Sequence, residues 1–293
     1  MRKPLRNIGA SVRARLLNLA KERNQPFDLL LTRYVLERLL YRLSLSQQRE
    51  RFVLKGAMLL TTWFDNPLRP TRDLDLLGFG DAKPDNIIAA FKEICAIDAK
   101  DAVTFDLDSI TVDNIREDQE YGGVRMKMFA NIDGARVRVV VDVGFGDAVE
   151  PGLTDAEIPV LLDFPAPKLR AYARETVIAE KFQAMVALGR ANTRMKDFYD
   201  VFVLLQSYEF NGDALARAIA ATFERRKTEI PSELPDALTS AFAEDKAKQE
   251  QWAAFLKDVE VDPGPLSDVI DTIAKKLMPH VDAAQTLRGK GGA

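Results

Sequence analysis

Apolar residues recur at helical spacing through the first 45 residues and again through most of the C-terminal half of the chain. In the N-terminal half, this spacing predicts helices over residues 8–23, 27–45, 56–63 and 84–96. In the C-terminal half, it predicts helices over residues 175–188, 196–207, 212–226, 246–256 and 266–278. The glycine-rich end, residues 288–293, is expected to be disordered.

Between these helical regions the chain is rich in β-branched and aromatic residues, which favour strands. Asp133-Gly134 has the composition of a tight hairpin turn. The segment after it alternates and then becomes continuously apolar, as a strand entering the interior of a sheet would. Strands are expected over residues 51–54, 74–79, 103–107, 110–115, 124–130 and 135–143.

Four prolines, at positions 151, 159, 165 and 167, then mark a connecting segment. The order of helices, mixed strands and helices predicts an α/β (α+β) protein with a helical C-terminal domain. We expect a first domain at residues 1–165, a helical domain at 166–287 and a tail at 288–293.

Composition narrows the possible chemistry. The 293 residues are 47% hydrophobic and 29% charged, as in soluble globular proteins, and no apolar run is long enough to span a bilayer. One cysteine, Cys95, excludes a disulfide framework and points to the cytoplasm. One histidine, His280, stands far from other reactive residues and argues against zinc or histidine-based catalysis. An enzyme of this composition would depend on carboxylates, lysines and a hard metal ion.

Charge is spread unevenly along the chain. Residues 1–55 carry thirteen Lys and Arg against four acids, a net charge of +9, whereas the remaining 238 residues carry −12. This excess of positive charge indicates either a polyanionic ligand near the N-terminal region or a solvated helical face, and both interpretations stay open.

The strongest chemical signal is an aspartate pair, Asp73 and Asp75. Residues two apart in a strand point to the same face, so the two carboxylates would lie together with Leu74 turned into the core. Such oxygen ligands suit Mg²⁺, although a lone pair of this kind is common on surface strands. Asp142 ends an apolar strand, and beside the Asp73–Asp75 strand it would complete a two-metal carboxylate cluster. Gly56, at a helix start, could leave backbone N–H groups open to a phosphate.

These segments resemble a known family. Lys55-Gly56-Ala57, Thr71-Arg72-Asp73-Leu74-Asp75 and Asp142-Val143-Gly144-Phe145-Gly146-Asp147 look like the motifs of the AbiEii/MenT nucleotidyltransferases, the toxins of type IV toxin–antitoxin systems. Glu180-Lys181 and Lys196-Asp197-Phe198-Tyr199-Asp200 are similar to two further motifs of that family. The resemblance covers roughly residues 50–205 and implies a nucleotidyltransferase fold, with the active site in a cleft between the two domains.

The resemblance also implies roles for individual residues. Asp73 and Asp75 would hold Mg²⁺ against a nucleoside triphosphate (NTP), and Asp142 would bind a second metal ion or act as the general base. Lys181 would neutralise phosphate charge, and Asp197 would help bind the nucleotide or orient Lys181.

The nucleotide would further contact Lys55, Gly56, Thr71 and Arg72. Many nucleotidyltransferases have Gly-Ser at the helix start, where this chain has Gly56-Ala57. The Thr71 hydroxyl could replace the missing serine.

The implied reaction transfers a nucleoside monophosphate to an acceptor hydroxyl, for which the resemblance suggests a tRNA 3′ end. It also implies a cognate antitoxin as protein partner. Two alternatives remain open at this stage. One is the same fold acting on a protein hydroxyl by nucleotidyl or phosphoryl transfer, and the other is a degenerate fold that only binds a nucleotide or a partner.

Overall fold

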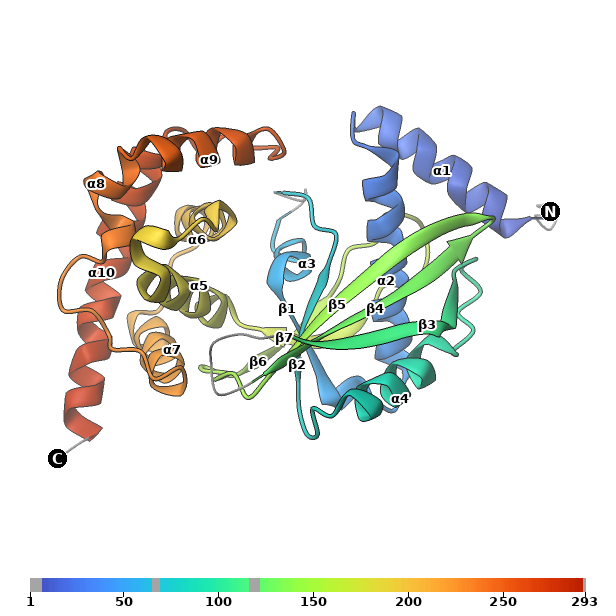
Figure 1. The fold of residues 1–293 in the computed structure, drawn as a ribbon, viewed down its shortest axis with the longest axis horizontal. Coiled ribbons are helices and arrows are strands. Elements are labelled where there is room, and N and C mark those ends of the chain that lie inside the picture. Colours follow the sequence, from blue (N-terminus) through green and yellow to red (C-terminus); the bar gives the residue numbers. More distant parts are fainter. Residues whose placement is uncertain (1–6, 65–68, 116–121, 292–293) are drawn as a thin grey trace. The chain divides into compact units, whose positions relative to one another are not determined.

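The computed structural model describes residues 7–64, 69–115 and 122–291, and the side chains up to residue 288 (Figure 1). The chain divides into two compact units. The first comprises residues 1–146 and 155–171, and the second comprises residues 147–154 and 172–293.

A seven-stranded mixed sheet runs in the order β3-β4-β5-β2-β1-β7-β6. The pairs β2–β5 and β1–β7 are parallel, and the pairs β1–β2, β3–β4 and β4–β5 are antiparallel. The strands are β1 (Phe52–Lys55), β2 (Leu74–Gly78), β3 (Thr104–Ile115), β4 (Gly123–Ile132), β5 (Ala135–Phe145), β6 (Leu153–Glu157) and β7 (Lys168–Tyr172).

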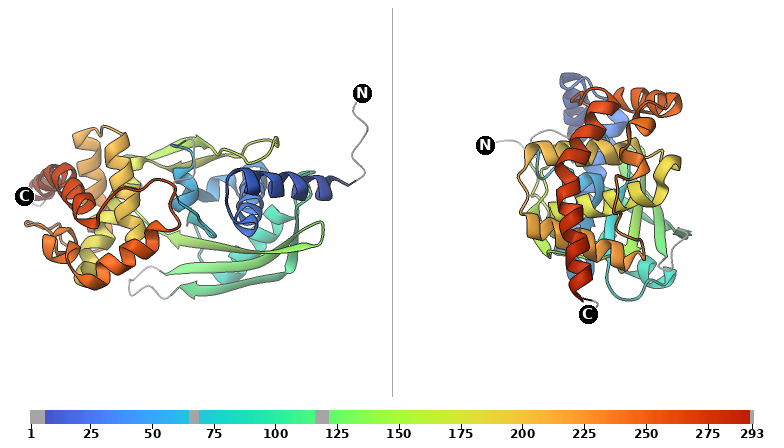
Figure 2. Two further views of the ribbon diagram at one scale, coloured as in Figure 1. Left: turned by 90° about the horizontal axis from the view of Figure 1, so that it is seen from above. Right: turned by 90° about the vertical axis from the view of Figure 1, so that its left-hand side faces the viewer.

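Helices cover one face of this sheet in the first unit. Strands β4 and β5 alternate buried and more exposed residues, so Met126, Met128, Val139 and Val141 form an apolar face. Helices α2 and α4 pack on that face, as Figures 1 and 2 show. The helices of this unit are α1 (Ile8–Glu22), α2 (Phe27–Leu45), α3 (Gly56–Leu60) and α4 (Pro84–Cys95), with a 3₁₀ turn at Arg49–Arg51.

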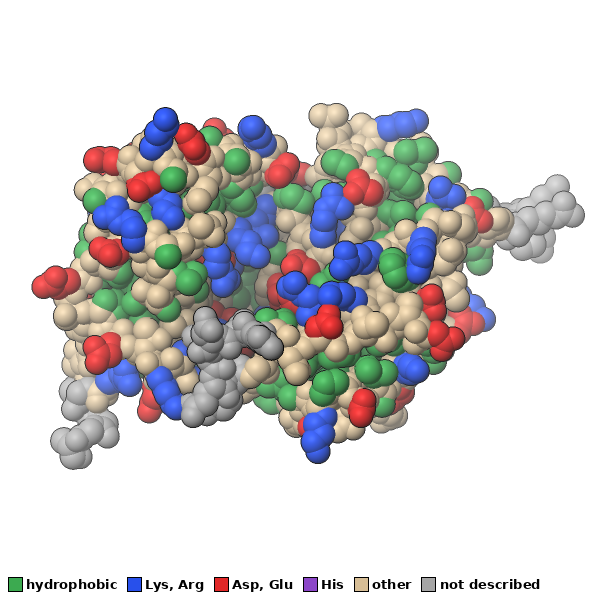
Figure 3. Space-filling view, viewed as in Figure 1, with side chains coloured by type: hydrophobic (Ala, Val, Ile, Leu, Met, Phe, Trp, Pro, Cys, Tyr) green, Lys and Arg blue, Asp and Glu red, His purple; other side chains and the backbone are tan. Residues whose placement is uncertain are grey.

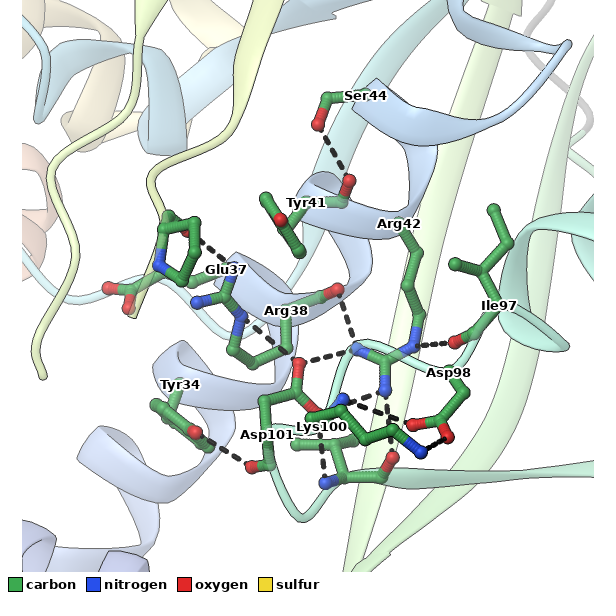
Figure 4. Close-up of polar contacts among 12 residues, drawn as sticks. Tyr34, Glu37, Arg38, Tyr41, Arg42, Ser44, Ile97, Asp98, Lys100 and Asp101 are labelled. Atoms are coloured by element: carbon green, nitrogen blue, oxygen red, sulfur yellow. Dashed lines mark hydrogen bonds and ion pairs between the residues drawn. The ribbon is translucent and has the colours of Figure 1, made fainter. Parts of the chain in front are cut away.

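A buried ion network fixes α2 to the loop that precedes β3 (Figure 4). Arg42 donates to both carboxylate oxygens of Asp101, at 2.7 and 2.9 Å, and it also donates to the carbonyls of Arg38, Ile97 and Val103. The Nε atom of Arg38 lies 3.3 Å from Asp101. Both arginines and Asp101 are almost fully buried, and the ion pairs with Asp101 offset part of the cost of burying the two guanidinium groups.

The second unit is mostly helical, as the sequence predicts. Aromatic side chains form its core: Phe198 stacks on Phe242 with ring centroids 5.4 Å apart, and Phe182 lies 5.5 Å from Phe223. Its helices are α5 (Arg174–Leu188), α6 (Met195–Ser207), α7 (Gly212–Arg225), α8 (Ser240–Ala243), α9 (Lys246–Leu256) and α10 (Leu266–Gly291), with 3₁₀ turns at Gly189–Ala191 and Asp236–Leu238.

Three sequence predictions about local structure were wrong. Residues 104–115 form one strand with a register shift between Asp106 and Thr111, because a β-bulge absorbs the break that suggested two strands. The proline-rich connector contains a strand, β6, and a second strand, β7, directly follows its last proline. Helix α10 continues to Gly291, so the expected disordered tail is helical in that range.

The surface carries both signs of charge. On the face shown in Figure 3, acidic side chains lie among the basic ones over much of the visible surface. Among the described residues, the helices are too short or too polar to cross a membrane.

Candidate functional site

A row of four charged side chains crosses four neighbouring strands at one level of the sheet. In the strand register, Lys55 of β1 lies opposite Asp75 of β2, Asp75 lies opposite Asp142 of β5, and Asp142 lies opposite Arg125 of β4. Paired residues project to the same face of a sheet. The strand of Asp142 thus lies beside the strand of Asp75, which was the condition for a shared carboxylate site. The row has a cation at each end and two carboxylates in the middle.

Asp73 lies one residue before β2 and adds a third carboxylate near this row. Its Oδ1 atom accepts a hydrogen bond of 2.8 Å from the Thr71 hydroxyl. The Arg72 side chain donates at 2.6 Å to Asp28, which lies in the first turn of α2. This bond lowers the pKa of Asp28. Thr71 therefore contacts a carboxylate of the predicted site, whereas Arg72 contacts a carboxylate outside it.

Gly56 is required by its backbone conformation and by close packing against Asp75. Its φ angle is +71°, in the region that residues with a Cβ atom rarely adopt. A Cβ atom added there would lie 2.6 Å from both Cβ and Cγ of Asp75. The helix that begins at Gly56 has only five residues. The geometry thus assigns Gly56 the role of making room for the Asp75 carboxylate, and the predicted phosphate contact stays a prediction.

Asp142 is held by Arg125 through a bidentate ion pair. The Nε and Nη2 atoms of Arg125 donate to the two carboxylate oxygens of Asp142, each at 2.7 Å. This fork raises the pKa of Arg125, and the charges of Asp73 and Asp75 raise it further. Arg125 therefore interacts electrostatically with all three carboxylates of the predicted metal site.

The chemistry of this donor set suits Mg²⁺. Carboxylate oxygens are the ligands that Mg²⁺ prefers, and it is usually bound through one or two carboxylates, waters and substrate phosphates. Within the described part of the chain, no three His, Cys, Asp or Glu side chains form a group that could hold a metal ion. The Arg125–Asp142 pair gives a physical reason, because it turns the Asp142 oxygens toward a guanidinium.

The second unit contains a separate group around Lys181. The Lys181 ammonium lies 2.8 Å from Oδ1 of Asp197 and 2.8 Å from Oδ2 of Asp200. Both aspartates are fully buried, and Arg194 contacts the other oxygen of Asp197 at 2.7 Å. The structure thus brings Lys181 together with Asp197, and two cations offset the repulsion between the two acids.

Glu180, next to Lys181, belongs to a different group. The Tyr172 hydroxyl lies 3.2 Å from a carboxylate oxygen of Glu180 and 3.2 Å from one of Asp147. Arg226 lies 3.4 Å from Glu180 and 3.5 Å from Asp147. Burial, followed by the two carboxylates, raises the pKa of Tyr172 well above its usual value. This group joins α5 and α7 to the segment that follows β5.

The sequence interpretation did not single out Arg125, Tyr172 or Arg226. For Arg125 a usable signal exists. The Asp133-Gly134 turn has both residues at positive φ, +48° and +81°, and pairs Ile132 with Ala135. Counting outward from a two-residue turn places residue 125 opposite residue 142. Tyr172 and Arg226 reach their partners only through long-range packing, which no local pattern reveals.

Comparison with known proteins identifies the family of the chain. Residues 38–285 match the family described as nucleotidyl transferase AbiEii toxin, type IV toxin–antitoxin system. No protein of curated function matches the chain.

Two crystal structures from Helicobacter pylori are similar to it. One is a candidate nucleotidyltransferase, with 17% identity, a TM-score of 0.48 and coverage of 88% of this chain and 97% of the other. The second is JHP933, with 15% identity, a TM-score of 0.48 and coverage of 89% and 95%. The family match spans most of the chain, and the chain therefore belongs to the AbiEii family of nucleotidyl transferase toxins of type IV toxin–antitoxin systems.

Proposed function

We propose that the chain transfers a nucleoside monophosphate from an NTP to the 3′ hydroxyl of a tRNA, with Mg²⁺ held by Asp73 and Asp75. The observation that carries this proposal is the placement of Asp75 beside Asp142 in neighbouring parallel strands, with Asp73 two residues away. Bound Mg²⁺ would neutralise phosphate charge and orient the triphosphate for in-line attack.

The residues around the carboxylates have definable tasks in this reaction. Gly56 leaves the space that Asp75 occupies, and the Thr71 hydroxyl holds one oxygen of Asp73. Asp142 acts as general base for the acceptor hydroxyl or as a further metal ligand. Lys55, opposite Asp75 in the register, supplies positive charge for the nucleotide phosphates.

Lys181 supplies positive charge from the second unit. Its ammonium is oriented by two buried aspartates, Asp197 and Asp200, so its position is determined more tightly than that of a surface lysine. We propose that Lys181 contacts the nucleotide phosphates and that Asp197 acts as its positioning residue. Family membership implies an antitoxin as protein partner and an NTP as substrate.

The test is an incorporation assay with the full chain. The protein is incubated with total tRNA, Mg²⁺ and each α-³²P-labelled NTP in turn, beside Asp73→Asn and Asp75→Asn. Asp85→Asn, an exposed acid in the first turn of α4, serves as the matched control. Label should enter tRNA with at least one NTP, be lost in the two site variants and persist in the control.

Other outcomes separate the alternatives. Label found only in protein would leave nucleotidyl transfer in place and replace the tRNA acceptor with a protein hydroxyl. Nucleotide binding without any transfer would favour a binding protein. Undiminished transfer by Asp73→Asn would rule out the proposed metal site.

A further inference from the structure

Arg125 is hydrogen-bonded to the carboxylate of Asp142, which the proposed reaction uses as a general base or a metal ligand. Both oxygens of Asp142 accept hydrogen bonds from its guanidinium at 2.7 Å, and the two residues are direct neighbours across β4 and β5. The fork takes one acceptor site on each oxygen of Asp142, so a metal ion or the proton of the acceptor hydroxyl must compete with the guanidinium. The proposed function is therefore favoured when this ion pair opens.

The side chain of Arg125 is able to leave Asp142. It is 46% exposed, whereas Asp142 is 18% exposed, so the arginine has room to rotate and the aspartate does not. Arg125 also lies within the electrostatic influence of Asp73 and Asp75. A cation that binds these acids would repel the guanidinium and weaken its hold on Asp142.

A phosphate group offers Arg125 an equivalent partner. The planar fork of a guanidinium matches two oxygens of a phosphate as well as two oxygens of a carboxylate. An NTP bound at the carboxylates would bring phosphate oxygens close to the arginine. Arg125 could then exchange one bidentate acceptor for another without losing hydrogen bonds.

We propose that Arg125 is an exchangeable phosphate-binding residue, which holds Asp142 in the free protein and transfers its two N–H donors to the triphosphate when nucleotide binds. This inference rests on the proposed function, because it takes the three aspartates as the metal site. It predicts that nucleotide and divalent cation bind cooperatively. Bound nucleotide draws the Arg125 guanidinium away from Asp142, where it competes with the cation.

The test is a titration of the full chain with Mn²⁺ followed by electron paramagnetic resonance, with and without a non-hydrolysable α,β-methylene NTP analogue. In the unmodified protein the analogue should tighten Mn²⁺ binding by about tenfold, the scale of a typical coupling between two sites. In Arg125→Gln, Mn²⁺ alone should bind more tightly than in the unmodified protein. The analogue should bind this variant more weakly than it binds the unmodified protein, and it should hardly change the affinity of the variant for Mn²⁺.

Two further variants serve as controls. Arg125→Lys keeps the charge but loses the fork, so it should reproduce the weakened analogue binding, and it remains informative if Arg125→Gln fails to fold. Arg138→Gln removes an exposed arginine from the same face of β5 and should behave as the unmodified protein. A thermal melt of each variant checks folding.

The outcomes distinguish this inference from the function on which it rests. If Asp73→Asn abolishes Mn²⁺ binding while both Arg125 variants match the unmodified protein, the metal site stands and the exchange is refuted. If Asp73→Asn binds Mn²⁺ as well as the unmodified protein does, the metal site itself is wrong, and the exchange is refuted with it.

Discussion

Replacing Gly56 with alanine gives the sharpest test of how the fold positions Asp75. An alanine at φ +71° costs about 1–2 kcal/mol in backbone strain. Its Cβ atom would also lie 2.6 Å from Cγ of Asp75, whereas ordinary contacts begin at 3.4 Å. The added Cβ atom would overlap the Oδ2 atom of Asp75 even more closely, so the carboxylate must move by at least about 0.8 Å, the difference between these two distances.

A displacement of this size matters for catalysis. Mg²⁺ requires near-ideal ligand distances of roughly 2.0–2.1 Å, and a misplacement of about 1 Å can lower a rate roughly 100-fold. We therefore expect Gly56→Ala to reduce nucleotidyl transfer by about two orders of magnitude while unfolding remains cooperative. Urea denaturation measures the stability, and label incorporation measures the rate.

Gly80→Ala is the matched control. Gly80 has a φ of +84°, but a Cβ atom there would have no neighbour within 4 Å. The control therefore shares the backbone strain and lacks the collision, so it should lose about 1–2 kcal/mol of stability and keep its activity. Equal activities for the two variants would refute the argument that Gly56 exists to make room for Asp75.

Three further predictions concern buried charges. Burial raises the pKa of Glu37 to about 7. The folded state then holds a proton that the unfolded state releases, so Glu37 should lower stability by up to roughly 3 kcal/mol as pH rises from about 4.5 to 7. The urea midpoint of Glu37→Gln should not show this fall between pH 5 and 8. If the midpoints of the variant and the unmodified protein differ by the same amount across that range, the prediction is contradicted. Asp101→Ala leaves Arg42 buried without its partner, and calorimetry should show a loss of about 3–5 kcal/mol. Asp98→Ala breaks two exposed contacts, with the ammonium and the backbone N–H of Lys100, and should change the melting temperature far less. Similar shifts in both variants would therefore count against the buried network. Lys181→Met should destabilise the protein because the buried Asp197 and Asp200 lose the ammonium that they share, and adding Asp200→Asn should restore part of that stability. Purely additive effects in this double-mutant cycle would show that the ion pair is not coupled.

Local patterns in the sequence were enough to predict much of the fold and one part of the site. Alternation and the Asp133-Gly134 turn determine the pairing of β4 with β5, because a two-residue hairpin leaves no freedom of register. The two-residue spacing of Asp73 and Asp75 indicates a shared face, since side chains alternate along a strand. Apolar spacing alone predicts α5, α6, α7, α9 and the first half of α10, but it gives no sign of the short helix α8.

Other features depended on contacts between residues far apart in the chain. Strand β6 lies in a segment whose prolines suggested a connector, and β7 begins directly after the last of them. Only pairing with the sheet makes such short segments strands. The parallel pairing of β2 with β5 sets Asp75 beside Asp142, although the two residues are 67 positions apart in the sequence.

The partners of buried charges were also decided by tertiary structure. The sequence contains the carboxylates of the proposed site. Counting outward from the Asp133-Gly134 turn also places Arg125 opposite Asp142. It does not reveal that the two side chains form a fork, or that Glu180 and Lys181 contact different groups. A charge pairs with whichever opposite charge the packed fold brings near it, because burial makes an unpaired charge costly. The sequence alone thus determined which ionisable groups are present, and the tertiary structure determined which of them meet.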